Sequence, residues 1–285
     1  MLPNLLIVGA QKSGTTSLHR LLESHREIYF PSRFQEIHYF DLEENFRRGT
    51  RWYESLFDGW AGQAYCAQTS PLYMYEPAAA ERIRDLLPEA RILFILRQPV
   101  DRAYSHYWHE VRFGYEDLSF EQALAREGKR ISRGFEERRH HSYLDRGRYS
   151  GQVDRFYRLF GRERCLVLLQ DELRTSVEGV RKKVASFLDL SLKGFSEGRA
   201  GGFHLNRAGV PRSRALQRLR RRVRRLTPLA LAIDRINLRR DGYPPMAPEL
   251  RERLQQEMEP EIQALEELTG LDLGRWRPGQ EAAGP

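Results

Sequence analysis

Four short runs of apolar residues mark the strands that this sequence predicts. They are residues 4–8, 64–68, 91–96 and 164–170. Runs that are apolar at consecutive positions are typical of a parallel sheet buried on both faces. Since longer amphipathic stretches separate the runs, we expect the strands to alternate with helices that cover the sheet.

The predicted helices show the spacing of one apolar face. In the first, residues 15–24, Leu18, Leu21 and Leu22 fall on the same side. A later helix, residues 175–188, opens with Thr175 and Glu178 at the spacing of a capping box. The other helical stretches are residues 77–87, 100–113, 147–160 and 248–268.

This alternation predicts an α/β fold with a central parallel sheet flanked by helices and a helical C-terminal elaboration. We expect a single domain over residues 1–285, with a flexible tail at 278–285. No window holds the roughly 18 uninterrupted apolar residues of a spanning helix. The first apolar run is too short for a signal peptide. We therefore expect a cytoplasmic protein.

The turn after the first strand has the features of an anion-binding loop. Gly9 and Gly14 have the spacing of a nucleotide P-loop, and a helix follows, so backbone N–H groups and a helix N-terminus point at the same place. Thr15 occupies the position of the P-loop lysine, and Lys12 lies inside the loop. A kinase or ATPase would also need an acidic magnesium ligand. The strand at 91–96 ends instead at Arg97, which favours an anionic ligand without magnesium.

A second basic position follows that strand. Arg97 lies at the carboxyl edge, where open α/β sheets bind their ligands. Pro99 suits the first turn of a helix, and Ser105 lies about one and a half turns later. An arginine can hold a phosphate through two donors at once, and a serine can add a hydroxyl.

The positive charge is concentrated in one segment. The chain carries a formal charge of +8. Residues 212–240 hold eleven arginines against one acid and carry +10, which leaves −2 for the rest. Leu216, Leu219, Val223 and Leu226 have helical spacing, so we expect a basic amphipathic helix within residues 205–245. An anionic membrane, an acidic acceptor or carrier protein, and nucleic acid all suit it, as does a plain solvated helix. No nucleic-acid-binding motif accompanies it, so we expect no specific nucleic-acid partner.

Together the two motifs resemble the PAPS-dependent sulfotransferase superfamily, where PAPS is 3′-phosphoadenosine 5′-phosphosulfate. Residues 11–16 resemble its 5′-phosphosulfate loop, and residues 97–105 its 3′-phosphate motif. The stretches 36–41, 69–73 and 202–204 are similar to segments of the heparan sulfate N- and 3-O-sulfotransferases. The resemblance extends over about residues 4–212 and implies sulfuryl transfer from PAPS.

The resemblance also implies roles for individual residues. Glu36 matches the general base, with His38 as second choice or as its orienting partner, and Lys12 would offset charge on the leaving phosphate. Phe203 would stack on adenine, and one of Arg207, Arg212 and Arg214 would close over the 3′-phosphate; the choice among them stays open. The cofactor-binding set is then Gln11, Lys12, Ser13, Gly14, Thr15, Thr16, Ser17, Arg97, Ser105, Phe203, Arg207 and Arg212.

The acceptor is less well defined. We expect a hydroxyl, with an amine as second choice, on a small-molecule, saccharide or lipid-linked acceptor. His38, Tyr39, Tyr73, Trp108 and His109 offer surface for it. The family often has lysines where this chain has Gln35 and Gln68, which argues against a highly sulfated polymer. A P-loop kinase or NTPase, and a non-catalytic binder of anionic polymers, are the alternatives. The cysteines, Cys66 and Cys165, form no CxxC motif, and we expect no metal. The oligomeric state stays open.

Overall fold

The computed structural model describes residues 1–31, 36–196, 209–223, 227–239 and 242–277. The chain divides into two compact units, each made of two segments. The first unit contains Met1–Arg97 and Tyr149–Leu205, and the second contains Gln98–Arg148 and Asn206–Pro285. The α/β class that the sequence predicts is confirmed. That the whole length forms one domain stays a prediction.

The first unit is built on a parallel five-stranded sheet with the order β2-β3-β1-β4-β5. Its strands are β1 (Leu5–Gly9), β2 (Ile28–Tyr29), β3 (Tyr65–Thr69), β4 (Arg91–Leu96) and β5 (Cys165–Leu169). The four longer strands match the predicted apolar runs. After β1 the chain continues to β2 and β3 on one side of β1 in the sheet. After β4 it continues to β5, on the opposite side. Adjacent strands whose connections diverge in this way form a crevice at their carboxyl ends, where such sheets bind ligands.

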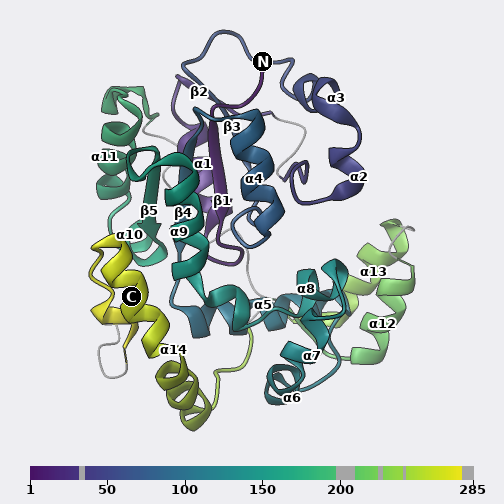
Figure 1. The fold of residues 1–285 in the computed structure, drawn as a ribbon. Helices are drawn as coiled ribbons and strands as arrows, with labels where there is room; N and C mark the ends of the chain where they lie inside the picture. Colours follow the sequence, from purple (N-terminus) through teal and green to yellow (C-terminus); the bar gives the residue numbers. More distant parts are fainter. Residues whose placement is uncertain (32–35, 197–208, 224–226, 240–241, 278–285) are drawn as a thin grey trace. The chain divides into compact units, whose positions relative to one another are not determined.

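Helices cover both faces of this sheet (Figure 1). The helices of the first unit are α1 (Thr15–Glu23), α2 (Glu43–Phe46), α3 (Gly49–Ser55), α4 (Pro77–Leu86), α9 (Tyr149–Phe160), α10 (Gln170–Thr175) and α11 (Val177–Leu188). Leu18 of α1 and Val184 of α11 share one core cluster with Leu5 and Ile7 of β1. On the other face, α4 packs beside α9, whose Phe156 ring lies 5.4 Å from that of Phe94.

One predicted helix start is wrong. The sequence predicts a helix opening at Thr175 with Glu178 in a capping box, but Thr175 is the last residue of α10. Its hydroxyl donates to the Asp171 carbonyl at 2.9 Å. Ser176 caps α11 instead, accepting from the Gly179 N–H at 3.0 Å. Two neighbouring hydroxyl residues offer the same capping chemistry, and the preceding helix uses one of them.

The second unit is mainly helical and is organised around α5. Its elements are α5 (Pro99–Phe113), α6 (Phe120–Ala125), α7 (Glu127–Ile131), α8 (Phe135–His141), β6 (Val210–Pro211), α12 (Arg214–Arg222), α13 (Thr227–Asn237), β7 (Leu238–Arg239) and α14 (Pro248–Thr269). Both α12 and α14 pack on α5. Leu254 and Met258 of α14 join Val100 and Ala103 of α5 in one apolar cluster. β6 and β7 pair antiparallel.

Buried charges run through this second unit. Glu110 on α5 bonds to the ring of His140 at 2.7 Å and lies 3.3 Å from that of His106. Glu116 pairs with Arg130 and accepts from the Tyr143 hydroxyl at 2.8 Å. Both carboxylates are almost fully buried. A core of this kind depends on polar partners as well as on apolar burial.

The arginine-rich segment forms two helices where the sequence predicts one. α12 ends at Arg222 and α13 begins at Thr227. Pro228 explains the division, because it lacks the N–H that a continuous helix would need there. Across the described residues, no helix combines the length and the apolar character needed to cross a membrane.

Candidate functional site

The loop between β1 and α1 has a tightly defined backbone. Ala10 donates its N–H to the Ile95 carbonyl at 2.8 Å, which ties the loop to β4. Lys12 and Gly14 both have positive φ angles, of 70° and 98°. Gly9 is crowded, because a Cβ there would lie 2.7 Å from the Cβ of Met74. Glycine is therefore favoured at both ends of the loop, at Gly9 by the close contact with Met74 and at Gly14 by the positive φ angle. Such backbone freedom is typical of an anion-binding turn.

The start of α1 offers polar groups suited to an anion. No side chain caps its N-terminus, where Gly14 precedes the first turn. Ser13 is fully buried, and its hydroxyl has no hydrogen-bond partner in the described part of the chain. A buried hydroxyl without a partner is costly. A phosphate or sulfate oxygen at the helix N-terminus would satisfy it, so these residues fit an anionic group.

Arg97 lies against the same loop. Its Nη1 donates to the Lys12 carbonyl at 3.4 Å, and its own carbonyl accepts from the Tyr149 hydroxyl at 3.0 Å. The structure thus brings together the lysine of the first motif and the arginine of the second. Ser105 lies on α5 in the second unit and is half-buried.

A buried polar network at the end of β3 holds the segment that follows Glu36. Gln68 donates to the Ile37 carbonyl at 3.0 Å and to the Tyr73 hydroxyl at 2.7 Å. That hydroxyl also donates to the Ile37 carbonyl at 2.7 Å and accepts from the Tyr39 N–H at 3.0 Å. The β3 end is itself bonded to β1, since Ser70 donates its N–H to the Ile7 carbonyl at 3.0 Å. The network fixes this segment to the strand beside the anion loop.

His38 lies between two carboxylates. Its Nδ1 bonds to Asp41 Oδ2 at 2.8 Å, and its Nε2 lies 3.3 Å from Glu36 Oε2. Burial of the ring opposes its positive charge, but the hydrogen bonds to Asp41 and Glu36 outweigh it and raise the pKa of His38 to about 9. The ring is therefore protonated at neutral pH and donates to both acids. Glu36 remains exposed to solvent.

Sequence reasoning missed two residues of this arrangement. Asp41 appeared only as part of a matching stretch, and its buried carboxylate is the nearer partner of His38. At position 68 the sequence shows only a glutamine where the family often has a lysine. In the structure Gln68 is buried and donates to the Ile37 carbonyl. His38 and Asp41 are three residues apart, but this spacing alone does not indicate that the two side chains meet.

The residues predicted to contact the acceptor lie in different surroundings. Tyr39 and Tyr73 are buried, and the Tyr39 ring stacks on Tyr53 at 4.2 Å. Trp108 and His109 are half-buried on α5, where Trp108 stacks on Tyr243 at 6.2 Å. The burial of the two tyrosines favours a positioning role over a surface that meets an acceptor.

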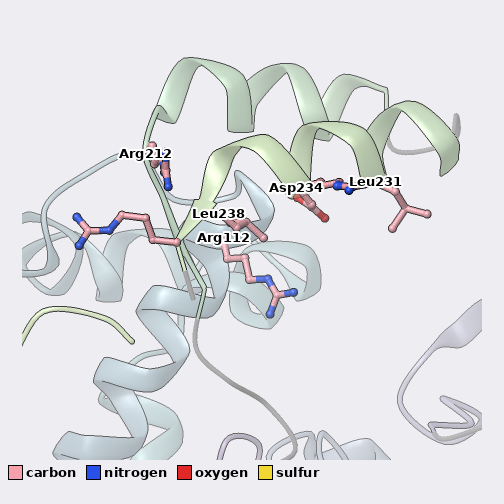
Figure 2. Close-up of a pocket in the computed structure, with 7 residues that line it drawn as sticks. Arg112, Arg212, Leu231, Asp234 and Leu238 are labelled. Atoms are coloured by element: carbon pink, nitrogen blue, oxygen red, sulfur yellow. The ribbon is translucent and has the colours of Figure 1, made fainter. Parts of the chain in front are cut away.

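The late basic and aromatic candidates are only partly described. Phe203 and Arg207 lie outside the described residues. Arg212 lines a pocket in the second unit (Figure 2). Arg214 donates to the Leu118 carbonyl at 3.4 Å and the Tyr107 hydroxyl at 3.3 Å. Among the described residues, no cluster of His, Cys, Asp and Glu side chains is arranged to hold a metal ion.

Comparison with known proteins identifies the family. The sulfotransferase domain family matches residues 2–201. The chain belongs to the sulfotransferase family. A crystal structure of a sulfotransferase from Alicyclobacillus acidocaldarius superposes with a TM-score of 0.73 at 32% identity. That match covers 97% of this chain and 99% of the other. The resemblance stated from the motifs is confirmed.

Other sulfotransferases are similar over part of their length. Human bifunctional heparan sulfate N-deacetylase/N-sulfotransferase 2 is 30% identical over 201 residues, which is 67% of this chain and 22% of that protein. The matched region therefore spans about a fifth of that relative. The structure of mouse sulfotransferase SULT7A1 complexed with PAP has a TM-score of 0.52 at 15% identity, covering 96% of this chain and 86% of that one. It shares the fold.

Proposed function

We propose that this sulfotransferase transfers a sulfuryl group from PAPS to an acceptor hydroxyl, with Glu36 as general base. The observation that carries the proposal is the Glu36–His38–Asp41 chain, which is held at the end of β3 beside the β1 anion loop. A base and an anion cradle on neighbouring strand ends are the two parts that in-line displacement at sulfur requires.

PAPS supplies the sulfuryl group and a nucleotide phosphate as leaving group. The N-terminus of α1, with Thr15 and Thr16, would bind its 5′-phosphate, and the Ser13 hydroxyl would donate to the same anion. Lys12 would offset the negative charge that grows on the departing phosphate oxygen. Gln11 and Ser17 complete this loop side of the proposed cofactor site. Ser13 fits the role, because its buried hydroxyl has no partner elsewhere in the described chain.

The other end of the nucleotide is assigned from the motifs. Arg97 and Ser105 are proposed to bind the 3′-phosphate, and the Arg97 contact with the Lys12 carbonyl supports the first of these. Phe203 is proposed to stack on adenine. Of the arginines proposed to close over the 3′-phosphate, Arg214 already contacts the second unit's own backbone, which favours Arg207 or Arg212.

Glu36 is proposed to accept the acceptor's proton. Its carboxylate is exposed, so an acceptor can reach it, while protonated His38 orients it from within. As the acceptor oxygen bonds to sulfur, its proton passes to Glu36, and the bond from sulfur to the phosphate oxygen breaks. His38 is already protonated at neutral pH, so it serves better as the positioning residue than as the base.

A saccharide is the acceptor class that the relatives favour, since several of them are heparan sulfate N-sulfotransferases. At position 68 this chain has a buried glutamine that donates to the Ile37 carbonyl. It therefore offers no positive charge there to a polyanionic acceptor. We therefore propose a weakly charged saccharide, small-molecule or lipid-linked acceptor. A hydroxyl is our first choice and an amine the second, and the names of these relatives support the second.

Nucleotide binding tests the cofactor assignment. Because the loop offers donors and the end of β4 offers a cation in place of an acid, 3′,5′-ADP should raise the melting temperature without magnesium. ATP with magnesium should have little effect. Thermal-shift measurement with each nucleotide checks this. Stabilisation by ATP with magnesium alone would instead support a kinase or NTPase.

Turnover of the Glu36→Gln variant tests the general base. Loss of the carboxylate should lower turnover of PAPS by about 100-fold or more and leave 3′,5′-ADP affinity unchanged. Glu54→Gln is the matched control, because both carboxylates are 49% exposed. Turnover is followed with labelled PAPS over a panel of hydroxyl and amine acceptors. Near wild-type turnover in the Glu36 variant would remove this residue as the base.

A further inference from the structure

The helices α12 and α13, here called the basic hairpin, expose several apolar side chains, and the buried position of α12 is polar. The residue of α12 that is buried against the second unit is Gln217. Its amide donates to the Arg112 carbonyl and accepts from Asn237 at 3.0 Å. Polar contacts of Gln217 therefore help to fix the hairpin to α5. On α13 the apolar Ala230 and Ile233 are buried, whereas Leu216 and Leu219 of α12 remain exposed.

Exposed apolar side chains gather on this hairpin. In the described part of the chain, five of the seven large exposed apolar residues lie on α12 or α13. They are Leu216, Leu219, Leu229, Leu231 and Ile236. Leu231 and Ile236 are 61% and 72% exposed, so most of each side chain is open to solvent. A cluster of this kind marks an interaction surface.

Arginines surround these apolar side chains. Arg218 and Arg220 pair with Asp117 and Asp234, at 3.0 and 2.7 Å. Arg222 and Arg235 are exposed and form no ion pair with another described residue. The segment from 212 to 240 holds Asp234 as its one acid, and that acid is already paired. The surface is therefore complementary to a partner with negative charge.

A basic pocket lies at the base of the same hairpin (Figure 2). It has a volume of about 680 Å³ and is lined by both basic and apolar side chains. The lining residues are Arg112, Arg212, Leu231, Asp234, Arg235, Leu238 and Arg239. Its arginines suit a phosphodiester, and Leu231 links the pocket to the exposed apolar face.

We propose that the basic hairpin binds the surface of an anionic membrane. Leu231 and Ile236 enter the boundary between headgroups and acyl chains, and the arginines meet lipid phosphates. Exposed apolar side chains beside arginines favour lipid over an acidic protein, because the boundary between headgroups and acyl chains offers anionic and apolar groups together. Nucleic acid would use the arginines and leave the apolar side chains in water. Arg212 lines the pocket and is also a candidate for the 3′-phosphate. Leu231, Ile236, Arg222 and Arg235, on which this proposal is tested, are not part of the proposed transfer site.

Vesicle flotation tests this proposal with the full chain, without nucleotide or acceptor. The protein should float with vesicles of phosphatidylcholine and phosphatidylglycerol, and remain unbound with phosphatidylcholine alone. Binding should weaken as salt is added, since the arginines face solvent. Failure to bind the anionic vesicles would overturn the proposal, and would leave the nucleotide and turnover tests unaffected.

Two pairs of variants separate insertion from simple charge attraction. Leu231→Gln with Ile236→Gln should weaken vesicle binding at least about tenfold, because each buried apolar side chain contributes substantially. Leu192→Gln is the control, as Leu192 is also exposed but lies outside the hairpin. Arg222→Gln with Arg235→Gln should weaken binding similarly, with the exposed Arg26→Gln as control.

The melting temperature of each variant without nucleotide, compared with that of the wild type, shows whether the variant is folded. The surface recognises charge alone if the apolar double variant binds vesicles as wild type does. The same conclusion follows if soluble polyglutamate releases the protein fully from the anionic vesicles. Either result would overturn membrane insertion.

Discussion

The pair of carboxylates around His38 sets the chemical state of the proposed base. Asp41 is buried, and its Oδ1 has no hydrogen-bond partner in the described chain, so His38 is its main compensation. The charged ring in turn fixes the direction of Glu36. Glu36 could be proposed from the sequence, because its flanking motif resembles a family pattern. The Asp41 contact could not, since it depends on how the backbone turns between positions 38 and 41.

The stability of the protein should depend on the charge of His38. The folded-state pKa of about 9 lies above the ordinary 6.5, so the ring contributes stability that is complete below pH 6.5 and is lost as pH rises toward 9. His38→Gln should therefore be destabilised relative to wild type at pH 6, by up to about 3 kcal/mol more than at pH 10. Urea denaturation at a series of pH values measures the difference.

The closer carboxylate provides the control for that experiment. Asp41→Asn removes the buried charge, so the loss of stability with rising pH should shift to lower pH. If the difference between wild type and His38→Gln were constant from pH 6 to 10, His38 would not be held in its charged form.

Elements were predictable where an apolar pattern defines them. β1, β4 and α14 lie within one or two residues of their predicted positions, because burial of apolar side chains decides them. The short helices α6, α7 and α8 were not predicted. They pack around polar contacts such as the pair of buried Glu116 with half-buried Arg130, which a hydrophobic pattern does not show. The exposed apolar stripe of α12 is a further case, since periodicity predicts a helix but not which face is covered.

A glycine controls how α12 packs on α5. Gly114 ends α5 with a φ of 76°, and a Cβ there would lie 2.6 Å from the Gln217 carbonyl. Gly114→Ala should therefore destabilise the protein by at least about 1–2 kcal/mol, since the left-handed backbone and the contact both oppose it. Hydrogen exchange should rise in α12, whereas the loop after β1 should be unaffected.

Gly128→Ala is the matched control for this change. Gly128 lies in α7, and a Cβ there would meet nothing within 4 Å. The control should be neutral or slightly stabilising, because alanine favours helix. Equal exchange rates in α12 of the wild type and the Gly114 variant would contradict the packing role.

At the scale of the whole molecule, net charge is a poor guide to the chemistry. The +8 of the chain arises from one segment in the second unit, and the remainder carries −2. The proposed transfer chemistry depends on Lys12, Arg97 and the start of α1 in the first unit, which are individual groups with defined neighbours. The family was predictable because these groups fall into ordered motifs. The division into two units was not, because each unit is assembled from segments far apart in sequence.

That division has a consequence for how the protein is made. β5 pairs with β4, but the segment Gln98–Arg148 is synthesised between them and belongs to the other unit. On the ribosome, β5 can therefore join the sheet only after the first segment of the second unit, Gln98–Arg148, has emerged. Closing such a long intervening segment slows strand pairing. Neither unit can be obtained as one continuous fragment, so limited truncation from either end would leave an interrupted fold rather than a separable half.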